Sequence, residues 1–395
     1  MSSTIVTAQT PSRISSLRVS QAQTVPWYVW SCVIASASIM IGLYWDISWH
    51  ATIGRDTFWT PAHLLIQFAA LLTAFSSSGL IFSTTFAGSP AAKGASVNVL
   101  GFRGPLGAFI SAWGGVAMLT SAPFDNWWHD AYGLDVKIIS PPHALLALGI
   151  GAILAGGVIL ILGEMNRAQG ALRKQLEYLL LLSGGLLLIL YLIFNLQNTG
   201  RVMMHSSVCY VAVVIGLPLL LEAMSRALNW KFGRTAMASV YTLFFLLSLW
   251  IFPLFPGEPK LGPVYRQVTH MIPMGFPLLI LIPALVLDLL QANAKTQAWG
   301  KWKQSLVAGI VFLGVLIGVQ WPFANFLMSP GARNWIFGTH YIYYAAPPTS
   351  LDVRYLFYQS TVNGFWMGMA AAIVVSILSA RLGIVWGDWM GEVRR

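Results

Sequence analysis

The chain has 395 residues, of which 56% are hydrophobic and only 9% are charged, and its formal net charge is +10. Soluble domains carry about 25% charged residues, so this composition excludes an ordinary soluble protein, whose surface needs more charge. The basic residues lie in short clusters between apolar runs, where membrane-topology signals usually lie, which argues against a nucleic-acid partner.

The first 25 residues are polar and rich in Ser and Thr, which predicts a flexible tail and not a cleaved signal peptide. From Trp27 onward, apolar runs of about 20 residues recur along the chain, and this length crosses a lipid bilayer. They predict an all-α, polytopic transmembrane helix bundle with the bilayer as a partner. The predicted spans, about ten in number, cover residues 26–47, 61–86, 104–124, 142–163, 175–197, 203–226, 234–254, 268–291, 304–328 and 360–387.

This arrangement of spans places both termini on the same side of the membrane. The same side carries the larger share of the 23 Lys and Arg residues, so we expect both termini in the cytoplasm. The connections that follow odd-numbered spans then face outward. For a bacterial inner membrane, the outward side is the periplasm.

The histidines fall in the outward half of this predicted topology. Ionisable groups near the apolar zone are costly and often mark function, although a lone histidine at an interface is more often a simple hydrogen-bonded side chain. The seven are His50, His63, His129, His143, His205, His270 and His340.

Two segments combine histidines with carboxylates in the same order, which indicates an internal duplication of a helix–loop–helix unit. Each reads Asp-x-x-Trp-His, has a second Asp six residues after that His, and continues to a Ser/Thr-Pro pair before another His. The repeat predicts a pseudo-twofold axis along the membrane normal. The two ligand sets are Asp46, His50 and His63, and Asp125, His129 and His143.

The spacing explains how each unit could bind a metal ion. An Asp and a His four positions apart share one face of a helix end, and the proline starts the returning helix so that the next His lies near its first turn. One carboxylate with two imidazoles binds divalent transition metals, and the ligands leave copper, zinc and iron open. The alternative is that Asp and His only pair with each other, but two matched copies favour metal. Asp56 and Asp135 are either outer partners of the ligands or turn residues.

The run from Tyr44 to His63 resembles the signature of the C subunit of particulate methane and ammonia monooxygenases. The resemblance covers about residues 25–165. It implies that Asp46, His50 and His63 bind copper. The second set matches a second proposed copper site of the family, in which an asparagine stands at the position of Asp125. The aspartate makes this site more anionic.

The resemblance also implies a function. The chain would be a copper-dependent membrane oxygenase component that activates O2 to hydroxylate a small substrate of the methane, ammonia or short-hydrocarbon class, together with other membrane subunits. One alternative is a membrane protein that binds or transports metal. A transporter should carry ionisable residues deep in several spans, whereas here they are expected to crowd one face. A non-catalytic subunit of a larger membrane complex is a further alternative.

The chain then divides into three parts. Residues 1–25 form the tail, residues 26–165 a four-helix module like the family's C subunit with both metal sites, and residues 166–395 a six-helix membrane extension of unknown role. In the extension, Met203, Met204 and His205 could offer soft ligands to copper(I). Core methionines and an interface histidine are the favoured explanation of the same residues.

Overall fold

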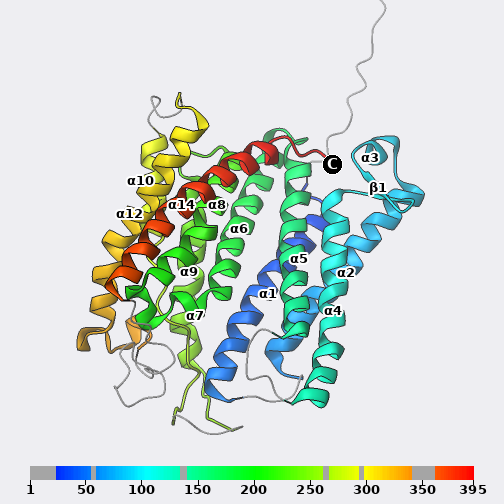
Figure 1. The fold of residues 1–395 in the computed structure, drawn as a ribbon. Helices are drawn as coiled ribbons and strands as arrows, with labels where there is room; N and C mark the ends of the chain where they lie inside the picture. The colour runs from blue at the N-terminus through cyan, green and yellow to red at the C-terminus, as the bar shows by residue number, and fades with distance from the viewer. Residues whose placement is uncertain (1–23, 55–58, 134–139, 261–266, 293–297, 340–360) are drawn as a thin grey trace, which may run out of the picture.

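The computed structural model describes residues 24–54, 59–133, 140–260, 267–292, 298–339 and 361–395. Within these ranges the chain is almost wholly helical, and nine helices are long and apolar enough to cross a membrane (Figure 1). The protein is therefore a polytopic membrane helix bundle. One hydrophobic core, with members from Val29 to Val393, joins the N-terminal and C-terminal parts of the bundle.

The long helices follow one another along the chain. They are α1 (Trp27–Thr52), α2 (Pro61–Ala87), α4 (Leu106–Tyr132), α5 (Pro141–Met165), α6 (Gly170–Phe194), α8 (Ser207–Leu228), α9 (Gly233–Ile251), α12 (Lys301–Leu327) and α14 (Val362–Met390). The shorter elements are α3 (Pro90–Gly94), the hairpin of β1 (Val97–Val99) and β2 (Phe102–Gly104), α7 (Leu196–Thr199), α10 (Leu281–Gln291) and 3-10 turns at Arg201–His205, Phe252–Leu254, Pro330–Ala332 and Trp335–Phe337.

Nine of the predicted spans are confirmed as helices in the described ranges. One difference between the predicted and the observed spans affects the ligand residues. Helix α1 continues to Thr52, beyond the predicted end at residue 47. Asp46 and His50 therefore lie on continuous helix, as their spacing requires. Both cysteines, Cys32 and Cys209, are buried and free.

The predicted helix over 268–291 is wrong. Residues 268–280 form neither helix nor strand, apart from an isolated bridge between His270 and Pro256, and only the last 11 residues form α10. Pro273 and Pro277 lack the N–H that a helix needs, and Gly275 between them weakens a helix further. Hydropathy detects the apolar run but not this loss of hydrogen bonds. Residues 268–280 are called the nonhelical segment below.

Helices α4 and α5 pack closely through paired glycines. A Cβ on Gly107 would lie 2.3 Å from the carbonyl oxygen of Gly156, and one on Gly114 would lie 2.7 Å from that of Gly149. Small residues of this kind let helix backbones approach in membranes, where burial of apolar surface alone does not drive association.

The two described ends of the chain lie at the same end of the bundle. Near the start of α1, Tyr28 donates a hydrogen bond of 2.6 Å to Glu164 near the end of α5. Asn166, which follows α5, donates to the carbonyls of Met390 and Val393 at the C-terminal end. The C-terminal ends of α1 and α4 and the first turns of α2 and α5 lie at the opposite end (Figure 1). Which end of the bundle faces the cytoplasm and which faces outward stays a prediction.

Candidate metal centre

The first hairpin brings its three predicted ligands together. Asp46 and His50 lie one turn apart near the C-terminal end of α1. The side chain of Thr60 accepts a hydrogen bond from the backbone N–H of His63, and Pro61 occupies the first turn of α2. This cap and the proline fix the start of α2, so that His63 faces back toward α1.

The ligand atoms of this hairpin converge on one carboxylate oxygen. Oδ1 of Asp46 lies 3.0 Å from Nε2 of His63 and 3.4 Å from Nε2 of His50. One ligand atom from each of the three residues lies within 4.8 Å of the other two. The Asp46 oxygen is buried and has no hydrogen-bond partner besides these contacts with the two imidazoles. The structure confirms that the spacing gathers these side chains.

This arrangement fits a transition-metal ion. A buried carboxylate oxygen without a hydrogen bond carries a free-energy cost of about 1–3 kcal/mol or more, which a bound cation would remove. One carboxylate and two imidazoles are a common ligand set for such ions, and the set leaves further coordination positions free. The exposed side of His50 gives the centre access from outside the bundle.

The second hairpin repeats the arrangement more loosely. The carboxylate of Asp125 lies 3.4 Å from Nε2 of His129 and 3.7 Å from Nε2 of His143. Oδ1 of Asp125 is again buried without a hydrogen-bond partner. Among the described residues, however, only the first set has all three ligand atoms within 4.8 Å of one another.

The other ring nitrogens of the second hairpin have oxygen partners. Nδ1 of His129 lies 3.2 Å from the carbonyl oxygen of Gly133, and Nδ1 of His143 lies 3.0 Å from Oγ of Ser140. Metal-binding histidines usually make this second contact, because it fixes the orientation of the ring and leaves Nε2 for the metal. Both Nε2 atoms face Asp125. The geometry therefore suits metal binding here too.

Three other predicted residues, Asp56, Asp135 and His340, lie outside the described ranges. Of the remaining histidines, His205 packs edge-on against Trp321 at 4.9 Å between ring centroids, and its Nε2 is buried without a hydrogen-bond partner. In the part of the chain that the structure describes, neither His205 nor His270 joins a carboxylate in a three-ligand group.

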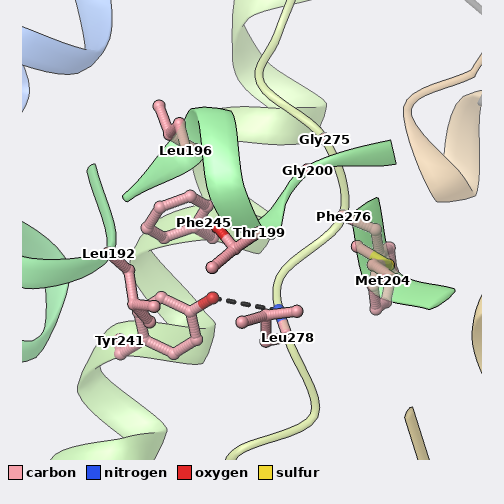
Figure 2. A pocket seen from close by; sticks show the side chains of 10 residues that line it. All are labelled: Leu192, Leu196, Thr199, Gly200, Met204, Tyr241, Phe245, Gly275, Phe276 and Leu278. Atoms are coloured by element: carbon pink, nitrogen blue, oxygen red, sulfur yellow. Dashed lines mark hydrogen bonds between the residues drawn. The ribbon is translucent and has the colours of Figure 1, made fainter. Parts of the chain in front are cut away.

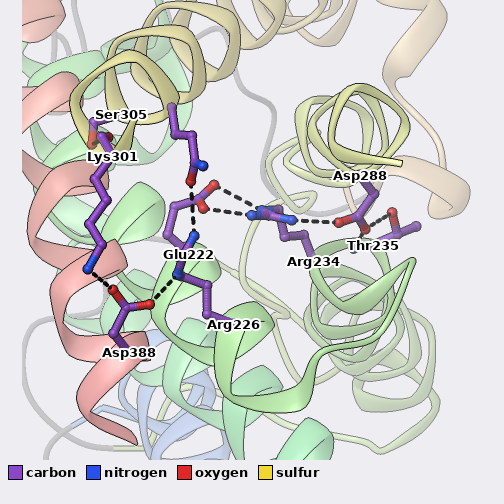
Figure 3. A network of polar contacts seen from close by, with 9 residues as sticks. Glu222, Arg226, Arg234, Thr235, Asp288, Lys301, Ser305 and Asp388 are labelled. Atoms are coloured by element: carbon purple, nitrogen blue, oxygen red, sulfur yellow. Dashed lines mark hydrogen bonds and ion pairs between the residues drawn. The ribbon is translucent and has the colours of Figure 1, made fainter. Parts of the chain in front are cut away.

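A buried ion network in the C-terminal part was not predicted. Arg234 on α9 is 1% exposed and makes two hydrogen bonds to Glu222 on α8 and one to Asp288 on α10 (Figure 3). Asp288 also accepts hydrogen bonds from the backbone and hydroxyl of Thr235. The signal was present in the sequence, because Glu222 and Asp288 are acidic residues inside predicted spans.

A second group continues the network toward α12 and α14. Arg226 on α8 and Lys301 on α12 both bind Asp388 on α14, at 2.8 and 2.7 Å (Figure 3). These residues lie near the end of α14, away from the histidine hairpins. The expectation that ionisable residues crowd one face is therefore wrong.

The nonhelical segment borders a cavity of about 40 Å³ (Figure 2). Its walls include Met204, Phe245, Phe276 and Leu278, and Tyr241 accepts a hydrogen bond from the backbone N–H of Leu278. The cavity is distinct from both ligand sets, since none of their six residues lines it.

A scan against models of protein families found no match to the chain. Searches of curated proteins and of solved structures also found no match.

Proposed function

We propose that the chain binds copper at Asp46, His50 and His63 and is a component of a copper-dependent membrane oxygenase. The observation that carries the proposal is the convergence of two imidazole nitrogens on a buried carboxylate oxygen that has no hydrogen-bond partner. The same ligand types in the α4–α5 hairpin support a second copper site. The resemblance of this part of the chain to the monooxygenase C subunit supports copper over zinc or iron.

The residues of the chain would have two roles, to hold the ion and to shield it from water. Asp46, His50 and His63 would hold copper, which when bound would supply the redox chemistry that activates O2. The hairpin belongs to an apolar bundle, and we expect a small apolar substrate to approach it from the bilayer. A water-poor site also limits wasteful side reactions of a strong oxidant. We place the centre on the periplasmic side, with other membrane subunits beside it.

The experiment compares the purified protein with two single variants in detergent. Wild type should contain copper, and His50→Ala and His129→Ala should each lose part of it. Reconstituted with its co-purifying subunits, wild type should hydroxylate a short hydrocarbon or ammonia only when O2 is present. Wild type without any redox metal in its active, purified form would overturn the proposal.

Metal transport is a second candidate, because two observations in the C-terminal part favour it. The nonhelical segment interrupts a membrane-spanning stretch, and interrupted spans form ion sites in many transporters. Arg234, together with Glu222 and Asp288, also places buried charge between three helices of this part, near the ends of those helices. Copper uptake into sealed vesicles, lost in His50→Ala, would support transport. Hydroxylation without uptake would support the oxygenase, and neither activity without added subunits would favour a non-catalytic subunit.

A further inference from the structure

The back of the first hairpin is bound to the nonhelical segment by three side chains of α1. Ser48 donates a hydrogen bond of 2.7 Å to the carbonyl of Ile272, and Thr52 accepts one of 2.8 Å from the N–H of the same residue. Tyr44 accepts one of 3.0 Å from the N–H of Met274. Each of the three hydroxyl residues is at most 2% exposed. The backbone groups of Ile272 and Met274 are therefore satisfied by α1 instead of by a helix of their own.

The three hydroxyl residues and the two metal ligands of α1 occupy different faces of the helix. Tyr44, Ser48 and Thr52 follow one another at intervals of four and form a single stripe. Asp46 and His50 lie two positions from members of this stripe, which places them on the far side, toward α2. The segment thus fixes the helix from behind without touching the ligands through these bonds.

The loop that contains Gly257 and Lys260 also contacts the C-terminal end of α1. The N–H of Lys260 donates to the carbonyl of Ile53, just after α1. A Cβ on Gly257 would lie 2.8 Å from Cγ2 of Thr52, so this loop also packs directly against the stripe. The last two turns of α1 are consequently held on the side opposite the ligands.

Within the described part of the chain, the second copy of the unit lacks this support. The residues of α4 that correspond to Tyr44, Ser48 and Thr52 are Pro123, Trp127 and Ala131. None of them has a hydroxyl group, and all three are exposed. The second hairpin has the same ligand types without these hydroxyl groups, so it serves as an internal control for their effect on the first hairpin.

We propose that Tyr44, Ser48 and Thr52 are positioning residues for the first metal site. They lock the end of α1 in place, so this site is preorganised and fills at a lower copper concentration than the second site. A ligand set that is already held in place loses less freedom on binding and so binds more tightly. The inference rests on the proposed function in one respect only, namely that both ligand sets bind metal.

The test measures each site in isolation. In a His129→Ala background only the first site is intact, and in a His50→Ala background only the second. Thr52→Val, which removes the hydroxyl group but keeps the shape, should weaken copper(II) binding about tenfold in the first background, within the range found for outer partners of metal ligands. It should also broaden the copper(II) electron paramagnetic resonance spectrum, because the ligands sample more geometries. In the second background both readouts should stay unchanged.

Two matched variants separate positioning from general loss of stability. Thr52→Ser keeps a hydroxyl group and should restore affinity and spectrum. Thr73→Val removes an equally buried hydroxyl group of α2 that bonds only to its own helix, at the carbonyl of Ala69, and should change neither readout.

The possible failures are distinguishable. Equal weakening of both sites by Thr52→Val, or an unchanged first site, would overturn the positioning role while leaving metal binding intact. The absence of copper binding in both backgrounds would overturn the proposed function, and the positioning role with it.

Discussion

The α1–α2 and α4–α5 hairpins carry the same ligand types at matching positions, yet the surrounding chain supports them differently. The first has the nonhelical segment behind its metal-binding helix, whereas the corresponding residues of the second are exposed. The carboxylate–imidazole distances follow the same order, 3.0 and 3.4 Å in the first and 3.4 and 3.7 Å in the second. A duplicated motif therefore does not guarantee duplicated sites, because the neighbours of each copy decide how firmly its ligands are held.

Removing the shared carboxylate would have the largest effect on this comparison. Asp46→Ala and Asp125→Ala each delete the carboxylate that both imidazoles of the hairpin face. We expect a loss of copper affinity of at least about 100-fold at the altered site, beyond what loss of an outer partner costs. Copper titration in detergent should show one remaining site in each variant, with the tighter one remaining in Asp125→Ala. Two intact sites in either variant would contradict the ligand assignment.

Disrupting the ion network would test whether the support of the first hairpin extends to the far end of the bundle. Arg234→Met leaves Glu222 and Asp288 buried without their cation and should destabilise the fold by about 3–5 kcal/mol. Because α10, which carries Asp288, continues directly from the nonhelical segment, the first copper site should weaken more than the second. Unfolding in denaturant and copper titration measure the two effects. Arg103→Met, on exposed β2, is the control.

A glycine substitution would weaken the second hairpin alone. Gly114→Ala places a Cβ within 3 Å of the backbone of α5, at the carbonyl of Gly149, so the two helices must separate. We expect a destabilisation of about 1–3 kcal/mol and weaker copper binding at the second site. Gly151→Ala, at a position with open space around it, should instead stabilise the helix by about 0.5–1 kcal/mol. Thermal unfolding should therefore show shifts of opposite sign.

The helix caps should give the smallest effect. Ser140→Ala removes the N-cap of α5 and the oxygen that lies 3.0 Å from Nδ1 of His143. The cap alone stabilises by about 1 kcal/mol. We expect a modest loss of copper affinity at the second site, measured in the His50→Ala background. Ser140→Thr keeps the hydroxyl group and should behave like wild type. Equal losses in both variants would argue against the role of the hydroxyl group.

Local sequence patterns predicted most of the fold and the ligand sets. Apolar run length identified nine helices, since crossing a bilayer demands a continuous helix in most places. The interval of four between Asp46 and His50, with the capped proline start before His63, was sufficient to bring the first ligands together. These features depend on residues close in sequence.

The parts that were missed depend on contacts distant in sequence. Ser48 and its partner Ile272 are 224 positions apart. No local pattern reveals that hydroxyl groups of α1 replace the helical hydrogen bonds that Pro273 and Pro277 prevent. The ion network was missed for a second reason. Arg234 lies at the start of α9, where a basic residue has the sequence signature of an ordinary topology signal.

The nonhelical segment also constrains how the chain is inserted into its membrane. With 11 residues, α10 spans about 16 Å, roughly half of the hydrocarbon layer. The residues before it cannot leave the translocation channel as an independent helix, because each unpaired backbone group costs several kcal/mol in lipid. One of their partners, Gln320, which accepts from the N–H of Leu279, lies on α12 and is synthesised later. This hydrogen bond therefore forms only after α12 has been synthesised, so the segment completes its bonding late in the folding of the chain.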